Sequence, residues 1–151
     1  MTAIKQGEGS PCFTDAMLLE LARDLRKNAH APCSGFTVGA ACRAESGVTY
    51  FGCNVENSSL PVGICAERVA VAMAISHGEK KITVLALAGG LRDKNPDGGI
   101  RPCGMCLQFL SDFMEPGGRI LVADGIDSYG EFTLSELLPQ AFRFKSSDMD
   151  D

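Results

Sequence analysis

The chain has 151 residues, 45% of them hydrophobic and 22% charged, and it carries a formal net charge of −5. This length suits one globular domain, and the acidic balance argues against a nucleic-acid binder, which normally shows a basic stripe. No apolar run reaches the roughly 18 to 20 residues that a membrane span needs. Residues 1–10 also lack an apolar stretch of signal-peptide length. We therefore expect a cytoplasmic protein with no nucleic acid and no membrane among its partners.

The two ends of the chain differ from the part between them. Residues 1–10 are polar and contain glycine, which is typical of a flexible N-terminal arm, and residues 146–151 read as an acidic tail. Residues 11–145 contain no linker, repeat or low-complexity stretch. The sequence therefore predicts a single domain over 11–145.

The first half of the domain is predicted to form a helix and a hairpin. Apolar residues recur at helical spacing over 14–28, and Thr14 can cap this helix at its N-terminus. Two short strands follow at 36–43 and 48–54, and the turn at 45–47 between them contains glycine. Residues 57–63 are expected to form a loop.

The second half alternates helices and strands. An apolar, alanine-rich helix is predicted over 65–77, with Gly78 ending it. The aliphatic run 82–88 is typical of a strand that is buried on both faces. A polar loop over 89–101, a helix from Pro102 to about 114, and antiparallel strands at 119–123 and 129–132 come next. A last helix begins near Thr133, where Thr133 and Glu136 fit a capping box. This order predicts an α/β protein with one mixed sheet between helices.

Seven cysteines are present, and without an export signal they argue against a disulfide framework. Four of them lie among apolar or turn residues and are interpreted as packing residues; these are Cys12, Cys33, Cys42 and Cys53. The other three stand in two short motifs, Cys65-Ala66-Glu67-Arg68 and Pro102-Cys103-Gly104-Met105-Cys106. Both motifs lie where helices are predicted to begin.

Three thiolates can bind Zn²⁺ and leave a fourth position for water, which is typical of a catalytic zinc site. Helix N-termini would stabilise the thiolates, and Arg68 could offset their excess charge. Glu67 is placed to move protons to and from the water, although a helix glutamate is more commonly a solvated charge. A lone Cys-x-x-Cys also fits a redox pair or half of a structural zinc site, but the only histidines are His30 and His77. Cys-Ala-Glu together with Pro-Cys-x-x-Cys is the zinc deaminase signature, with Cys in place of His.

These motifs are part of a wider pattern that resembles the cytidine deaminase family, in its small homotetrameric form with three cysteine ligands. The resemblance covers roughly residues 12–144 and implies a three-layer α/β/α fold with a mixed five-stranded sheet. It is carried by blocks at 34–41, 52–57, 65–68 and 102–108, and by 136–142, which matches the family's C-terminal helix.

The resemblance implies a zinc-dependent hydrolytic deamination of cytidine and deoxycytidine to uridine and deoxyuridine, with release of ammonia, as in pyrimidine salvage. Asn54 and Glu56 would bind the ribose hydroxyls, and Phe36 would pack beside the pyrimidine. The Ala66 N–H, with the carbonyl of Cys65 or Cys103, would orient the base. The remaining implied roles are zinc binding by Cys65, Cys103 and Cys106, proton transfer by Glu67, charge compensation by Arg68, and contact with a neighbouring subunit's active site by Phe142.

The sequence departs from the family pattern at three positions: Leu107 replaces a frequent arginine, Cys33 a frequent tyrosine, and Leu60 a common aromatic residue. Three other functions remain open. They are deamination of another aminopyrimidine nucleoside such as an antibiotic, editing of a polynucleotide, and a non-catalytic zinc module with four ligands. Asn54 and Glu56 favour a free ribose, and the acidic chain without tryptophan argues against polynucleotide work.

Overall fold

The computed structural model describes residues 13–143. The predicted arm at 1–10 and tail at 146–151 lie outside these residues, as does Cys12. Within the described part, five strands form one sheet in the order β2-β1-β3-β4-β5. Only β3 and β4 run parallel; the other neighbours are antiparallel. The strands are β1 (Phe36–Ala44), β2 (Thr49–Cys53), β3 (Ile82–Leu91), β4 (Met114–Asp124) and β5 (Ser128–Thr133).

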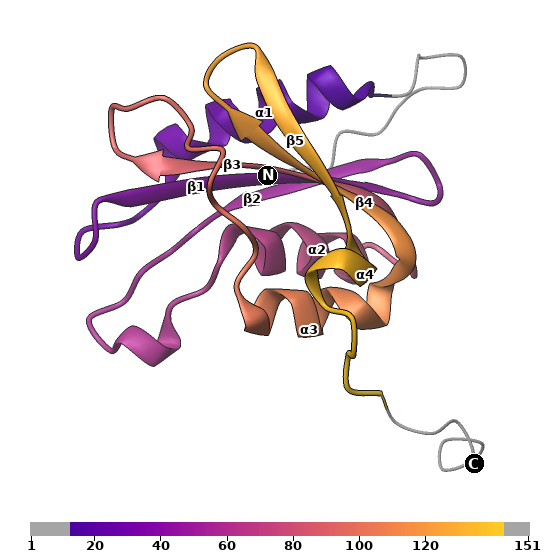
Figure 1. Ribbon diagram of the computed structural model, residues 1–151. Coiled ribbons are helices and arrows are strands. Elements are labelled where there is room, and N and C mark those ends of the chain that lie inside the picture. Colours follow the sequence, from indigo (N-terminus) through magenta and orange to yellow (C-terminus); the bar gives the residue numbers. More distant parts are fainter. Residues whose placement is uncertain (1–12, 144–151) are drawn as a thin grey trace.

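Helices cover both faces of this sheet, which confirms the predicted α/β class (Figure 1). One face carries α1 (Asp15–Leu25), and the other carries α2 (Ala66–Ser76) and α3 (Gly104–Phe113). A single-turn 3₁₀ helix follows α1, and another precedes α2 at Leu60–Val62. No helix within residues 13–143 is long and apolar enough to cross a membrane.

The helix boundaries follow from local capping. The Thr14 side chain accepts a hydrogen bond from the N–H of Met17 at the start of α1. Gly78, with φ +93°, adopts the left-handed conformation that commonly follows a helix, and it comes two residues after the end of α2. Both signals were correctly read from the sequence.

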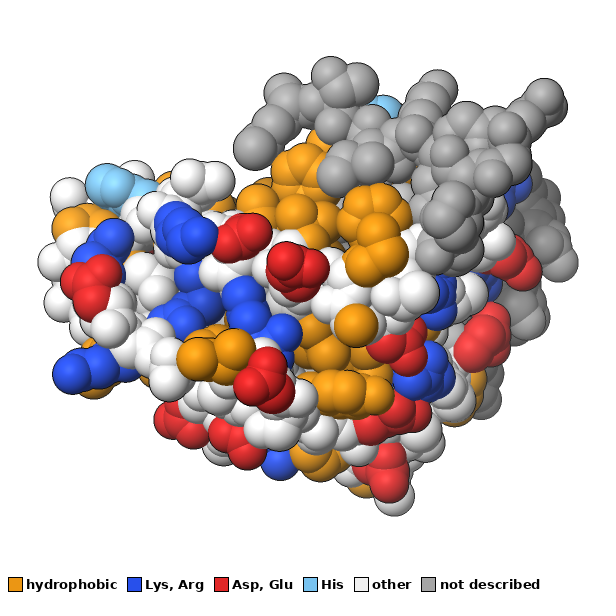
Figure 2. Space-filling model, turned by 90° about the horizontal axis from the view of Figure 1, so that it is seen from above, with side chains coloured by type: hydrophobic (Ala, Val, Ile, Leu, Met, Phe, Trp, Pro, Cys, Tyr) orange, Lys and Arg blue, Asp and Glu red, His pale blue; other side chains and the backbone are white. Residues whose placement is uncertain are grey.

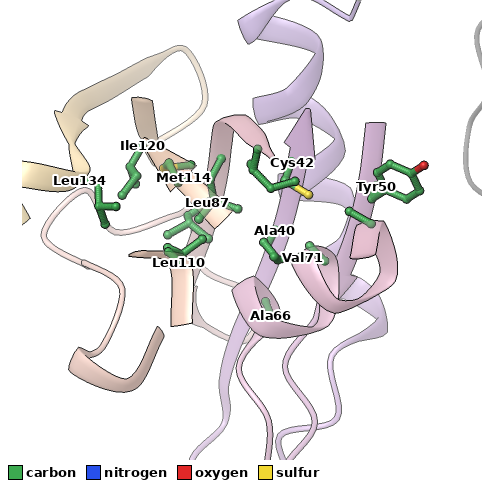
Figure 3. Packing of buried hydrophobic residues seen from close by; sticks show 14 of the residues in the cluster. Ala40, Cys42, Tyr50, Ala66, Val71, Leu87, Leu110, Met114, Ile120 and Leu134 are labelled. Carbon is green, nitrogen blue, oxygen red and sulfur yellow. The ribbon is translucent and has the colours of Figure 1, made fainter. Parts of the chain in front are cut away.

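The core lies in two layers, one on each face of the sheet. On the α2 and α3 face, Val71 and Leu110 point toward the sheet residues Ala40 and Leu87 (Figure 3). Cys42 is fully buried in this layer, as predicted for a packing residue. The same prediction is wrong for Cys33, which is exposed because it lies in the turn before β1.

The helices approach the sheet closely at two glycines. A Cβ added to Gly39 of β1 would lie 2.1 Å from the carbonyl oxygen of Ala22 in α1. A Cβ added to Gly52 of β2 would lie 2.5 Å from a methyl group of Val69 in α2. The missing side chains therefore let one helix pack against each face of the β1–β2 hairpin.

Three elements differ clearly from the sequence prediction. β4 begins at Met114 and not at 119, and Met114 pairs with Ile82 of β3. β3 continues through Gly89 and Gly90 to Leu91, because β1 extends far enough to pair with all three residues. The resemblance implied a helix over 136–142, but α4 (Leu134–Leu137) is one turn. Its predicted capping box is present, and the helix ends before Pro139 because the residue preceding a proline disfavours helical geometry.

Candidate active site

Three thiols converge where α2 and α3 begin. Cys65 is the N-cap of α2, Cys103 is the N-cap of α3, and Cys106 lies in the first turn of α3. The sulfur of Cys103 lies 4.0 Å from that of Cys65 and 3.5 Å from that of Cys106. The sequence separates Cys65 from the other two, and the fold brings them together by setting the two helix starts side by side.

This cluster fits a zinc ion. The three sulfurs lie within 4.8 Å of one another, and tetrahedral zinc with bonds of about 2.3 Å needs sulfurs about 3.8 Å apart. No other group of three metal-ligating side chains occurs in the described part of the chain. Both histidines stand outside the cluster, so these residues supply three ligands and leave the fourth position of a tetrahedron to a non-protein group.

The surroundings of the cluster favour a thiolate at Cys65, whereas the hydrogen bond to Cys65 and burial raise the pKa of Cys106. Hydrogen bonds, chiefly from Cys106, lower the pKa of Cys65 to about 5, and the Arg68 guanidinium adds to this effect. Burial opposes the charge on Arg68, but hydrogen bonds to Cys65 and Cys106 outweigh it and raise the pKa of Arg68. Arg68 also donates to the carbonyl of Gly63. Arg68 therefore places a positive charge beside the sulfurs.

Glu67 is the buried carboxyl group of the site. Its residue is only 6% exposed, although it belongs to the first turn of α2. Burial raises the pKa of Glu67 to about 7, because the low-dielectric surroundings disfavour the charged form. A carboxyl group that gains and loses a proton near neutral pH is suited to general acid–base catalysis.

Two of the thiols, Cys65 and Cys103, line a cavity of about 240 Å³ together with Glu67, and we name it the thiol cavity. β1 contributes the side chains of Phe36 and Val38, which share one face of the strand because successive side chains alternate. The sequence did not single out Val38, Ile100 or Arg101 as site residues. The lining residues are Ser34, Phe36, Val38, Asn54, Glu56, Cys65, Ala66, Glu67, Ile100, Arg101 and Cys103.

Asn54 and Glu56 both reach this cavity, and both already have protein partners. The Asn54 side chain accepts from the N–H of Val38 at 2.7 Å and donates to the carbonyl of Phe36 at 2.9 Å. The Glu56 carboxylate accepts hydrogen bonds from the hydroxyl of Ser34 and the N–H of Cys33. The Ser34 hydroxyl, chiefly, holds the pKa of Glu56 below its ordinary value. Both side chains are thus fixed in place before any ligand binds.

Phe142 lies elsewhere. Its residue is 64% exposed, and it is not among the residues that line the thiol cavity. The side-chain amide of Gln108 in α3 donates to the carbonyl of Phe142 and accepts from its N–H. This pair of bonds anchors the segment after α4 to α3. The sequence motif contained Gln108 but gave no sign of this role.

Comparison with known proteins decides the family. Residues 14–117 match the model of the cytidine and deoxycytidylate deaminase zinc-binding region. The chain belongs to this family. A cytidine deaminase of Sporosarcina psychrophila is 35% identical over 83% of this chain and 88% of its own length. One from Mycoplasma genitalium is 37% identical over 78% of this chain and 86% of its own.

Solved structures of the deaminase family agree. The crystal structure of cytidine deaminase from Burkholderia pseudomallei is 34% identical, with a TM-score of 0.76, and covers 85% of this chain and 99% of its own. Zinc is the metal that the family model names, and the cluster of Cys65, Cys103 and Cys106 fits it. Leu107, which replaces a frequent arginine in the resemblance, is 7% exposed and packs in the core.

Proposed function

We propose that this protein catalyses the hydrolytic deamination of cytidine and deoxycytidine in pyrimidine salvage. The observation that carries the proposal is a buried carboxyl group, Glu67, beside a three-thiol cluster in a cavity, in a chain of the deaminase family. When zinc is bound by Cys65, Cys103 and Cys106, it lowers the pKa of a water molecule and so supplies a nucleophile near neutral pH.

Glu67 carries the proton transfers in this proposal. Its carboxylate takes a proton from the attacking water and delivers it to the pyrimidine ring, which becomes more susceptible to attack at C4. A bond forms between C4 and the water oxygen, and the bond between C4 and the amino nitrogen breaks. Glu67 then transfers the second proton to the leaving amine, so one water is consumed and ammonia and uridine are formed.

The other cavity residues position the nucleoside. Asn54 and Glu56 are prearranged by their bonds to Phe36, Val38 and Ser34. The remaining amide N–H of Asn54 donates to the ribose hydroxyls, and the carboxylate of Glu56 accepts from them. Phe36 packs against the pyrimidine. Ala66 is the first residue of α2, where N–H groups lack partners within the helix, and it donates to the base.

Replacing Glu67 tests the reaction. Glu67→Gln keeps the size of the side chain and all three sulfurs, so we expect bound zinc and the fold to be unchanged. Turnover of cytidine should fall by at least about a hundredfold, because the proton path is lost. Loss of the cytidine ultraviolet absorbance measures turnover, deoxycytidine and cytosine being assayed in parallel, and metal analysis counts zinc.

The matched control is Glu20→Gln, which alters an exposed carboxylate on α1. Its activity should equal that of the unaltered protein. Full activity in Glu67→Gln with one zinc per chain would refute the assigned role of Glu67. Zinc-loaded unaltered protein that leaves all three compounds intact would refute the proposed reaction and favour another aminopyrimidine nucleoside.

We further propose that the active protein is a cytoplasmic homotetramer in which Phe142 contacts a neighbour's thiol cavity. The exposed, anchored Phe142 and the exposed apolar residues Leu60, Val62 and Met105 support this assembly. The sedimentation coefficient and the activity per chain should then fall together when the protein is diluted. Phe142→Ala should lower the activity more than it lowers the thermal stability. A fully active monomer would refute the shared site.

A further inference from the structure

A second cavity lies on the opposite side of β1 from the thiol cavity. Its volume is about 320 Å³, and the two cavities share no lining residue. We name it the basic cavity, because five of its lining residues are cationic and only one is acidic. The lining residues are Arg23, Arg26, Lys27, Thr37, Arg92, Asp93 and Lys94.

Arg26 forms the floor of the basic cavity. Its residue is 8% exposed, and its guanidinium donates to the carbonyls of Thr37, Leu91 and Lys94 at 3.0 to 3.1 Å. These bonds join the end of α1 to β1 and to the chain that leaves β3. The cavity is therefore a built feature, with its cationic groups carried on a fixed backbone.

The positive charges of the basic cavity have few acidic partners. Within residues 13–143, Lys27 pairs with Asp24, whereas Arg23, Arg26, Arg92 and Lys94 form no ion pair. Burial lowers the pKa of the Arg26 guanidinium, which is the expected response of a cation that lacks a neutralising group. Buried cations are normally paired, so this arrangement favours an anion from outside the chain.

A structural explanation accounts for part of the basic cavity. Cationic side chains are favoured at a helix C-terminus, which explains Arg23 and Lys27 at the end of α1. This explanation does not extend to Arg92 and Lys94, which follow β3 and add positive charge to the same face of the molecule. Lys and Arg side chains gather at one end of the face that carries α1 (Figure 2).

We propose that the basic cavity binds a small, multiply charged phosphate compound. Arginine guanidinium groups match phosphate oxygens in a two-point geometry, and lysines add charge without directional demands. A volume of about 320 Å³ is at the lower end for ligand cavities, which suits a small compound. The chain as a whole carries a net charge of −5, which opposes a long polyanion such as RNA.

Calorimetry of the full chain with inorganic pyrophosphate tests the proposal at constant ionic strength. We expect one pyrophosphate per chain. Arg92→Gln/Lys94→Gln should weaken binding by at least about tenfold, since charge-assisted hydrogen bonds to phosphate are lost. Both side chains are exposed, and the backbone groups that bond to Arg26 and Gly35 are kept. Unchanged circular dichroism verifies the fold.

Lys80→Gln/Lys81→Gln is the matched control, because it removes two positive charges from the surface before β3. It should bind pyrophosphate as the unaltered protein does. Equal affinity in all three proteins, or equal weakening in both variants, would overturn the proposal. Lys94→Glu, which reverses one charge, provides a second test and should also weaken the binding of pyrophosphate. Tighter binding of a short single-stranded oligonucleotide than of pyrophosphate would also overturn it.

Discussion

The thiol cavity and the basic cavity use consecutive residues of β1, with Phe36 and Val38 on one side and Thr37 on the other. They differ in what brings their charged groups together. In the thiol cavity, Cys65, Glu67 and Cys103 are fixed by the starts of two helices. In the basic cavity, the three arginines donate to backbone carbonyls of neighbouring segments, and Lys27 pairs with Asp24.

This difference explains why one site can be recognised from the sequence and the other cannot. Helix starts impose fixed spacings, so the cluster of metal-ligating thiols leaves a short motif in the sequence. The basic cavity is assembled from the end of α1 and a segment more than sixty residues later, with no common motif. A functional site that consists of scattered surface charges becomes visible only in three dimensions.

The largest expected effect is the loss of zinc and activity on replacement of a cluster cysteine, compared with replacement of a cysteine outside the cluster. Cys106→Ser removes a fully buried thiol of the cluster, and we expect loss of zinc and of essentially all deaminase activity. Cys33→Ser alters an exposed cysteine outside the cluster and should leave the zinc content unchanged. Metal analysis and cytidine turnover measure both variants. Full zinc occupancy in Cys106→Ser would show that the cluster is not the metal site.

A smaller effect is expected on the α1 face. Gly39→Ala puts a methyl group 2.1 Å from the Ala22 carbonyl oxygen, so α1 must shift. Overpacking of this kind costs about 1 to 3 kcal/mol of the free energy of unfolding. Gly117→Ala is the control, because no atom lies within 4 Å of its added Cβ. Thermal unfolding of the two variants side by side measures the difference, and equal melting temperatures would contradict it.

The smallest expected effect concerns the pH dependence of nucleoside binding. The Ser34 hydroxyl lowers the pKa of Glu56, so in the folded protein the carboxylate stays charged below the ordinary pKa of 4.5. Its contribution to stability is complete above 4.5 and is lost as pH falls through the lower, folded value. In Ser34→Ala, this pKa should rise, and the acid rise in KM for cytidine should begin at higher pH. An identical pH profile of KM in both proteins would exclude Glu56 as the titrating group.

Much of the fold was readable from local signals. Thr14, Gly78 and the Thr133 capping box marked helix boundaries, and the glycine-containing turn after β1 marked the hairpin. The end of β3 was not readable, because Gly89 and Gly90 favour a loop unless a partner strand continues beside them. The exposure of Cys33 could not be predicted either, since the sequence around a turn does not indicate whether a cysteine faces the core or the solvent.

The sequence by itself determined which chemical groups the proposed active site contains. Cysteines three residues apart, together with a Cys-Ala-Glu motif, specify three thiolates and one carboxyl group at helix starts, because spacing along a helix is independent of the rest of the fold. Only the tertiary structure decided that Glu67 is buried, that Gln108 anchors Phe142, and that Arg26 links three carbonyls beneath a cationic cavity. Burial and long-range hydrogen bonds depend on segments distant in the chain, and no local pattern records them.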